Sequence, residues 1–329
     1  MGLRTSNINP RVSILMPVYN NGDYVAEAIE SMLCQTFTDF ELIVLDDCST
    51  DHSREVIESF TDKRIIYNRN EKNIGLANNL NIGLDLSRGE FIARMDGDDI
   101  SLPERLQIQV DFLDNNPDID LCSCGLEKFG KETDIWIRDR DPEQIKITMM
   151  FFPPVLHATS VWRREKFERY GLRYNQDAFP AEDYDLWSRA IFYCKLANIP
   201  QVLYKYRIHG VQVTKMDDRV ETKDVQIRVE YLRRALPGLN EEDVIRFIEL
   251  TKKKELKRQD LIELKFLIKK IILINKKKLF FTTEKLSERL YQYYQARVFT
   301  FLKNNPKKTT NFDLLLALRI RQIVKLFLK

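Results

Sequence analysis

The first hundred residues alternate short apolar runs with longer segments in which apolar residues recur every three or four positions. The apolar runs lie at residues 12–16, 40–45, 65–67 and 91–95. The segments with helical spacing lie at residues 24–34, 53–60 and 77–86. Strands that alternate with helices predict a parallel sheet with right-handed crossovers. We therefore expect an α/β fold with a mostly parallel sheet flanked by helices.

The pattern is less regular in the middle of the chain and changes again after residue 217. Further elements are expected as strands at 119–126 and 204–208, a polar loop or hairpin at 128–140, and helices at 142–150 and from 181 onward. Beyond residue 217, Gly and Pro become rare and helical spacing dominates. We therefore divide the chain into an N-terminal tail (1–10), an α/β domain (11–216) and an all-helical C-terminal region (217–329).

The composition narrows the class of protein. At 329 residues, with 44% hydrophobic and 31% charged residues, the chain is globular and long enough for one large or two smaller domains. Cys122 and Cys124 would face the same side of a strand, which indicates buried thiols in a reducing compartment. No secretory signal and no run of about 18 apolar residues is present. We expect a cytoplasmic protein, either free or peripheral on the cytosolic face of a membrane.

Carboxylates cluster where the fourth strand ends. That stretch reads Phe91-Ile92-Ala93-Arg94-Met95-Asp96-Gly97-Asp98-Asp99. Open α/β sheets bind ligands at such strand ends, and crowded carboxylates repel one another unless a cation intervenes. Mg²⁺ and Mn²⁺ use one or two protein carboxylates and complete their shell with phosphate oxygens and water. Asp96 and Asp98 are therefore candidate ligands of a metal that carries a diphosphate. The alternative is a solvated acidic turn before a helix.

Five motifs follow one another along the chain. They are Val12-Ser13-Ile14-Leu15-Met16-Pro17-Val18-Tyr19-Asn20, Gln35-Thr36-Phe37 before Glu41-Leu42-Ile43-Val44, Asp46-Asp47-Cys48-Ser49-Thr50-Asp51, Asn73-Ile74-Gly75-Leu76, and Met95-Asp96-Gly97-Asp98-Asp99 before Pro103-Glu104-Arg105-Leu106. Together they resemble the inverting family-two glycosyltransferases over about residues 11–215. The resemblance implies the A-type glycosyltransferase fold, a Rossmann-like nucleotide-diphospho-sugar domain, with its metal at Asp98 and Asp96.

The resemblance also implies a set of nucleotide-binding residues. Tyr19 would lie flat against the base, and Pro17 would shape the loop that continues through Asn20. Asp47 would accept a hydrogen bond from a base N–H, and Asp46 would reach the base or the ribose. For both aspartates the alternative role is to cap the helix that follows.

The residues expected near the diphosphate lie in three further segments of the chain. Gly75 lies in the turn before the third helix. Arg94 would pair with a phosphate or with Asp96, which also counts among the nucleotide ligands. Near the end of the α/β domain, Arg207 would hold a phosphate or a carboxylate, and His209 would join the metal or a phosphate. A packed surface histidine is the alternative for His209.

A second chemical centre is expected at residues 181–189. Acidic residues in a first helical turn often stabilise the helix dipole, and that is one reading. However, Glu-Asp followed by Leu-Trp-x-Arg resembles the catalytic-base motif of the family. The resemblance implies that Asp183 takes the proton from the acceptor hydroxyl, while Glu182 and Trp187 shape the acceptor pocket. His157 lies in a segment that would run under the sugar, or it is a structural histidine.

The C-terminal region mixes basic and apolar residues. Lys252 to Lys278 contains eleven Lys or Arg, and Phe312 to Lys329 places Arg319, Arg321 and Lys325 among apolar residues at helical spacing. Such helices bind an anionic membrane surface, pack on one another, or form a homo-oligomer. Each charge buried in a spanning helix would cost roughly 2.5–3.5 kcal/mol, which favours surface attachment over spanning. No nucleic-acid-binding module is present, so no nucleic-acid partner is expected.

These features together predict a metal-dependent inverting glycosyltransferase with Mn²⁺ or Mg²⁺ as cofactor. It would move a sugar from a nucleotide-diphosphate donor, a UDP-sugar, to a saccharide or lipid-linked acceptor in bacterial surface polysaccharide or glycolipid synthesis. A sugar-nucleotide pyrophosphorylase is one alternative, but it would show a Gly-rich loop with a basic residue after the first strand. A non-catalytic nucleotide-sugar-binding or scaffold protein is the other, and Asp96, Asp98 and Asp183 argue against it.

Overall fold

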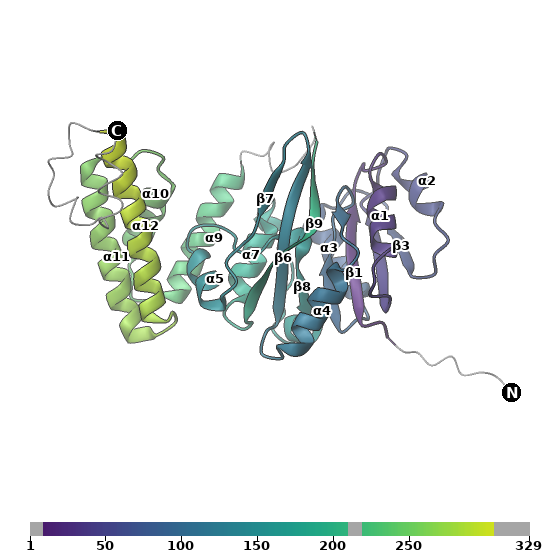
Figure 1. Cartoon of the computed structure of the whole chain (residues 1–329), viewed down its shortest axis with the longest axis horizontal. Coiled ribbons are helices and arrows are strands. Elements are labelled where there is room, and N and C mark those ends of the chain that lie inside the picture. Colours follow the sequence, from purple (N-terminus) through teal and green to yellow (C-terminus); the bar gives the residue numbers. More distant parts are fainter. Residues whose placement is uncertain (1–8, 210–218, 306–329) are drawn as a thin grey trace. The chain divides into compact units, whose positions relative to one another are not determined.

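The computed structural model describes residues 9–209 and 219–305 of the chain (Figure 1). Two compact units are present: Met1–Ile145 with Phe152–Asp224, and Lys146–Phe151 with Val225–Lys329. The first unit contains the sheet and the second is helical. The division by function at residue 216 stays a prediction.

Within the described residues, the first unit is built on a nine-stranded sheet in the order β3-β2-β1-β4-β8-β6-β9-β5, with β7 paired to β6. The strands are β1 (Val12–Val18), β2 (Phe40–Asp46), β3 (Ile65–Arg69), β4 (Phe91–Arg94), β5 (Ile100–Ser101), β6 (Leu121–Gly130), β7 (Asp134–Trp136), β8 (Val161–Arg163) and β9 (Leu196–Ile208). Strands β1 to β4 are mutually parallel, whereas β8 runs antiparallel to β4 and β6. The predicted fold class is confirmed, with a parallel half and a mixed half.

Helices cover both faces of this sheet. In the first unit they are α1 (Val25–Leu33), α2 (Ser53–Glu58), α3 (Leu76–Leu86), α4 (Arg105–Asn115), α6 (Arg164–Arg169) and α7 (Glu182–Ala190), with α5 (Pro142–Thr148) bridging into the second unit. Ile14 and Met16 pack in one apolar cluster with α1 and α4. Leu15 and Leu45 face α3, which approaches so closely that a Cβ on Gly83 would lie 2.5 Å from Leu45 Cδ1. Burial on both faces explains the nearly continuous apolar runs of β1 and β2.

The strand register brings the acidic segments to one edge of the sheet. Val18 of β1 pairs with Asp46 of β2, and Leu15 pairs with Arg94 of β4. Because these strands are parallel, the residues that follow each of them leave the sheet on the same side. The end of β9 returns to this edge, where Lys205 pairs with Ile100 of β5. The edge therefore collects the loops after β1, β2 and β4 with the last residues of β9.

Some elements differ from their expected bounds. Strand β9 begins at Leu196 rather than at residue 204, and β6 continues to Gly130. The polar segment 128–140 forms a hairpin, because the end of β6 pairs with β7. Strands β5 and β8 span only two and three residues, too few for an apolar pattern to reveal them.

The second unit is all-helical, as predicted. Its helices are α9 (Arg219–Ala235), which begins in the first unit, α10 (Glu241–Lys252), α11 (Arg258–Lys278) and α12 (Thr283–Asn304). Helix α11 packs against α10 and α12 (Figure 1). Over the described part of the chain, none of the helices combines the length and hydropathy needed to cross a bilayer. The basic helix expected at 312–329 lies outside the described residues.

Hydrogen bonds attach the short segment 146–151 to this helical unit. The buried Arg228 of α9 donates from Nε to the Met150 carbonyl (2.9 Å). Tyr231 donates from its hydroxyl to the Lys146 carbonyl (2.6 Å). The chain therefore contributes to the second unit twice, first with this segment and later with its C-terminal helices.

Candidate active site

The loop after β1 presents an aromatic ring to solvent. Tyr19 is 49% exposed, which leaves a flat face open to a ligand. Pro17 lies within β1, opposite Leu45 of β2. Asn20 has a positive φ of 54°, a left-handed conformation that asparagine tolerates better than most residues. The chain therefore turns sharply directly after Tyr19.

Hydrogen bonds join this loop to the loop after β2. They run from Asn20 N to Ser49 Oγ (3.1 Å), Asn21 N to Ser53 Oγ (2.9 Å), Gly22 N to Asp51 Oδ2 (2.9 Å) and Thr50 N to Asn20 Oδ1 (2.8 Å). Each uses a backbone N–H that neither strand could satisfy once it has ended. The two loops are thus held as one surface.

Asp46 is fully buried and has partners on both oxygens. Oδ1 accepts from the backbone N–H of Ser49 (2.8 Å), and Oδ2 accepts from the Tyr67 hydroxyl (2.8 Å) and from Arg69 Nε (3.1 Å). This carboxylate holds the second loop in place. Its expected reach to the base or ribose stays a prediction, and a ligand would have to share these bonds.

Asp47 shapes the turn before α3. Its Oδ1 accepts from Asn70 Nδ2 (2.8 Å) and the Ile74 N–H (2.9 Å), and its Oδ2 accepts from the Gly75 N–H (2.9 Å). Gly75 adopts φ 86°, a conformation that favours glycine. The following helix, α2, has His52 at its N-cap and no side-chain cap. The capping alternative is therefore wrong for both Asp46 and Asp47.

Arg94 pairs with Asp96 at the end of β4. The Arg94 side chain is buried, and its Nη2 lies 2.6 Å from Asp96 Oδ1. Burial, the largest single effect, lowers the pKa of Arg94, but the charge of Asp96 together with Tyr174, Tyr204 and the hydrogen bond to Asp96 raises it overall. The backbone N–H of Asp96 donates to the Tyr204 hydroxyl (3.1 Å). Of the two partners expected for Arg94, the structure contains the carboxylate.

The metal turn lies directly against the end of β1. A Cβ on Gly97 would come within 3.2 Å of the Pro17 carbonyl oxygen and 3.0 Å of Val18 Cγ2. Only a residue without a side chain fits this approach easily. The expected nucleotide loop and the expected metal turn are therefore neighbours, although Pro17 and Gly97 are 80 positions apart along the chain.

Asp98 and His209 form the second pair of this edge. His209 Nε2 lies 2.9 Å from Asp98 Oδ2, and the imidazole packs 4.9 Å from the Tyr24 ring centre. Burial, and then the charge of Asp96, raises the pKa of Asp98. Arg207 donates from Nε to the Asp98 carbonyl (2.7 Å) and forms an ion pair with Glu27. Arg207 thus holds a carboxylate, one of its two expected roles.

These side chains fit a divalent cation that also binds phosphate. Among the described residues, no group of three or more His, Cys, Asp or Glu side chains forms a self-sufficient metal site. Asp98 and His209 offer two donors, which suits a cation that completes its shell with phosphate oxygens and water. Burial, and then the charges of Asp96 and Asp98, raises the pKa of Asp99 well above its ordinary value, so the carboxylates of this turn repel one another. A cation would relieve that repulsion.

Glu182 and Asp183 open α7 as a buried acidic pair. Glu182 is 5% exposed, and its Oε2 is buried without a hydrogen-bond partner among the described residues. Burial, and then the charge of Asp183, raises the pKa of Glu182 to about 7. Burial also raises the pKa of Asp183 to about 6. The hydrogen bond that Asp183 accepts from the Tyr184 N–H (2.7 Å) lowers the pKa, but by less than burial raises it. A carboxylate that only stabilised the helix dipole would have a lowered pKa.

His157 and Trp187 lie in one aromatic cluster, with their ring centres 6.1 Å apart. His157 Nε2 is 2.9 Å from the Tyr174 hydroxyl, and burial, then the charge of Arg94, lowers the pKa of His157 well below its ordinary value. Trp187 is fully buried, with ring centres 5.8 Å from Trp162 and 6.3 Å from Phe167. In this arrangement Trp187 can influence an acceptor only through packing. The acceptor-side roles of both residues stay predictions.

Several residues of the site had no individual role in the sequence analysis. Arg105 is buried and donates from Nη2 to the Arg94 carbonyl (2.5 Å), and its guanidinium lies 5.1 Å from the Tyr204 ring centre. Glu27 of α1 pairs with Arg207, 180 residues further along the chain. Arg105 belongs to a motif that carried the family resemblance, which was a signal for it. Nothing in the local sequence around Glu27 or Tyr204 indicates their contacts.

Comparison with known proteins gives consistent matches. The family model described as Glycosyl transferase family 2 matches residues 13–192, more than half of the chain. An uncharacterized glycosyltransferase of Haemophilus influenzae is 35% identical over 220 residues, which cover 63% of this chain and 68% of that protein. One from Methanocaldococcus jannaschii is 35% identical over 209 residues, 60% of this chain and 71% of the relative.

Two solved structures share the fold. The TarS 1-349 structure of S. aureus in complex with UDP-GlcNAc superposes with a TM-score of 0.62 at 16% identity, covering 87% of this chain and 90% of that chain. The mannosyltransferase PcManGT of Pyrobaculum calidifontis in complex with GDP-Man and Mn²⁺ gives a TM-score of 0.53 at 17% identity, covering 91% and 89%. At these identities the likeness concerns the fold alone.

Proposed function

Because the chain belongs to glycosyl transferase family 2, we propose that it is a metal-dependent, inverting glycosyltransferase. It moves a sugar from a nucleotide-diphosphate donor, a UDP-sugar, to an acceptor hydroxyl. The observation that carries this proposal is Asp183, a carboxylate with a raised pKa that lies within electrostatic range of Arg94 and Asp96 at the strand-end edge. Direct attack of the acceptor hydroxyl on the sugar requires a general base close to the groups that bind the leaving diphosphate.

The donor would bind across the loops after β1 and β2. Tyr19 offers its exposed ring to the base, and Asp47 holds the turn at Gly75 against the same loops. Pro17 and Asn20 set the course of the first loop. Structures that share the fold contain UDP-GlcNAc or GDP-Man, which supports a nucleotide-sugar donor.

Asp98 and His209 would hold Mn²⁺ or Mg²⁺, with Asp96 beside them and oriented by Arg94. When bound, the cation neutralises charge that develops on the leaving diphosphate. A related fold has been solved with Mn²⁺. Arg207 keeps the turn in place through its bond to the Asp98 carbonyl (2.7 Å).

Asp183 would accept the proton of the acceptor hydroxyl. Its pKa of about 6 leaves it mostly ionised near neutral pH, yet more basic than an ordinary aspartate. Attack by the deprotonated hydroxyl from the face opposite the leaving group inverts the anomeric centre, and no protein nucleophile is needed. Glu182 Oε2, which has no hydrogen-bond partner among the described residues, would accept a hydrogen bond from a second hydroxyl of the acceptor. We propose a saccharide or lipid-linked acceptor in bacterial surface polysaccharide or glycolipid synthesis.

A product assay tests this proposal. Purified protein, Mn²⁺ and a panel of sugar nucleotides are incubated with candidate acceptors, and the released nucleotide is identified. Transfer yields free nucleoside diphosphate. Release of pyrophosphate from a sugar phosphate and a nucleoside triphosphate would instead favour a pyrophosphorylase, and binding without turnover a non-catalytic protein.

Substitution of the base sharpens the test. Asp183→Asn should lower turnover about 10²–10⁴-fold while donor binding persists. Asp185→Asn is the matched control, because Asp185 lies in the same helical turn but pairs with Arg189 (2.6 Å). Near-parent turnover in Asp183→Asn would assign the base elsewhere.

A further inference from the structure

One face of α11 carries exposed apolar side chains between rows of lysine. Phe266 is 62% exposed, Leu273 61% and Ile262 41%. At about 100° per residue, these three lie within roughly 40° of one another around the helix and extend over about 17 Å of its length. They form a narrow ridge, here called the α11 ridge, defined as Ile262, Phe266 and Leu273.

Basic residues flank the α11 ridge on both sides. By the same helical geometry, one row contains Arg258, Lys265, Lys269 and Lys276, and the other contains Lys270 and Lys277. Lys270 forms an ion pair with Asp243 of α10. No acidic residue of α11 lies on this arc, because Asp260 and Glu263 point elsewhere and pair with Arg246.

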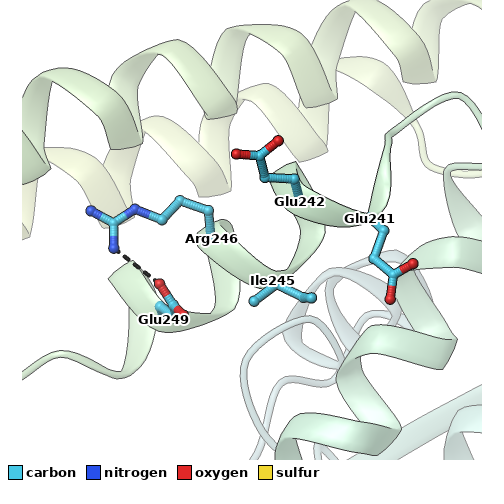
Figure 2. Close-up of a pocket in the computed structure, with 5 residues that line it drawn as sticks. All are labelled: Glu241, Glu242, Ile245, Arg246 and Glu249. Carbon is cyan, nitrogen blue, oxygen red and sulfur yellow. Dashed lines mark hydrogen bonds and ion pairs between the residues drawn. The ribbon is translucent and has the colours of Figure 1, made fainter.

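The opposite face of α11 fixes the orientation of the ridge. Leu264, Ile268 and Ile271 on that face are fully buried, and α11 packs against α10 and α12. The ridge therefore faces outward because the other side of the helix is already in the core. Helix α10 carries a group of acidic side chains: Figure 2 shows Glu241, Glu242 and Glu249 there, with Arg246 bonded to Glu249 (3.0 Å).

We propose that the α11 ridge and its lysine rows attach this protein to the surface of an anionic lipid bilayer. Apolar side chains would enter the boundary between headgroups and acyl chains, while the lysines on either side meet lipid phosphates. The proposal rests on α11 alone and does not depend on the proposed transfer reaction.

Charge complementarity favours an anionic bilayer as the binding partner of the α11 ridge over a second copy of the chain or its own residues 306–329. A second copy would bring another lysine-lined ridge against the first, and like charges would oppose each other. The chain's own residues 306–329 contain six Lys or Arg and one Asp, so they repel this face as well. An anionic bilayer offers both the negative charge and the apolar interior that the face lacks.

Vesicle flotation with the full-length protein tests the proposal. The probe is vesicles of phosphatidylcholine with phosphatidylglycerol, compared with pure phosphatidylcholine. The protein should float with the mixed vesicles at low salt, and less at high salt because the Debye length shrinks from about 10 Å at 0.1 M to about 3 Å at 1 M. Failure to bind the mixed vesicles would overturn the proposal.

Two variants locate the contact. Phe266→Ser should weaken partitioning about tenfold to a hundredfold, the value of burying one large apolar side chain. Lys269→Glu should weaken it about fivefold or more, since each basic residue near the surface contributes roughly that factor. Matched controls are Ile135→Ser, an exposed apolar residue of the first unit (59% exposed), and Lys63→Glu, an exposed lysine there.

Each outcome separates the ridge from its alternatives. Loss of flotation in both ridge variants, with parent behaviour in both controls and parent circular dichroism in all, supports the assignment. Unchanged flotation of Phe266→Ser and Lys269→Glu would overturn it and place the contact elsewhere, residues 306–329 included. A parent dimer that Phe266→Ser dissociates, with no vesicle binding, would also overturn it in favour of a second copy.

Discussion

The buried acidic pair at the start of α7 predicts a specific pH dependence of transfer. Burial raises the pKa of Asp183 from an ordinary 3.8 to about 6, and Glu182 lies higher, at about 7, because it is buried and faces the charge of Asp183. A general base works only when it is deprotonated. The rate should therefore rise with pH through the pKa of Asp183 and level off above it.

The size of the effect follows from that pKa. With a pKa of about 6, about nine tenths of Asp183 is ionised at pH 7 and about one tenth at pH 5. Turnover should therefore fall about tenfold between these pH values. An aspartate at its ordinary pKa of 3.8 would still be more than about 90% ionised at pH 5, and the rate would hardly change.

Glu182→Gln distinguishes the titration of Asp183 from that of Glu182. The substitution keeps the shape of the side chain and removes the carboxyl group with the higher pKa, about 7. Asp183 ionises first, while Glu182 is still mostly protonated, so the pKa of Asp183 does not depend on the charge of Glu182. The acid limb of the rate profile should therefore stay close to its position in the parent protein. A limb that disappears in Glu182→Gln would assign the titration to Glu182 instead.

The assay is transfer at saturating donor from pH 5 to 8. Mn²⁺-dependent UDP affinity is measured at each pH by calorimetry, so that any titration of the metal ligands appears there and not in turnover. A flat turnover profile in the parent protein over this range, with unchanged UDP affinity, would refute the raised pKa of Asp183.

Two further predictions concern the metal and the core. Asp98→Ala should abolish Mn²⁺-dependent UDP binding without altering the free energy of unfolding, because it removes one of the two metal donors, Asp98 and His209, at the strand-end edge. Calorimetry measures the UDP affinity, and an unchanged affinity would contradict the prediction. Trp187→Ala should lower the free energy of unfolding by about 3–5 kcal/mol because it empties a fully buried aromatic site, whereas Trp187→Phe should lower it less. Urea titration measures both variants. A loss below about 0.5 kcal/mol for Trp187→Ala would be typical of a surface residue and would contradict the prediction.

The parallel half of the fold could be predicted because its signals are local. Strands β1, β2 and β4 are buried on both faces and appear as apolar runs, and α1 and α3 show helical spacing between them. The mixed half is different. Strand β9 contains Pro200, and its pairing with β6 is irregular around Gly125, so no simple period marks its first residues. Its position depends on pairing with a strand about 75 residues earlier.

The candidate site divides in the same way. Asp96, Asp98 and Asp183 could be proposed from strand ends, a helix start and the family resemblance. The partners that set their charge could not, because Arg94 offered two alternatives and Asp98 meets His209 across 111 residues. Asp47 is the clearest example. The sequence suggested a ligand contact or a helix cap, and the bonds to the N–H groups of Ile74 and Gly75 were not foreseen. The ligand contact stays a prediction.

The hydrogen bonds between the loops after β1 and β2 have a consequence for local stability. Each loop provides donors and acceptors to the other, so the amides of Asn20, Asn21, Gly22 and Thr50 are protected by the same set of contacts. Opening one loop would expose the protected amides of both. The two loops should therefore behave as one cooperative unit in amide hydrogen exchange, and the surface around Tyr19 would be lost or kept as a whole.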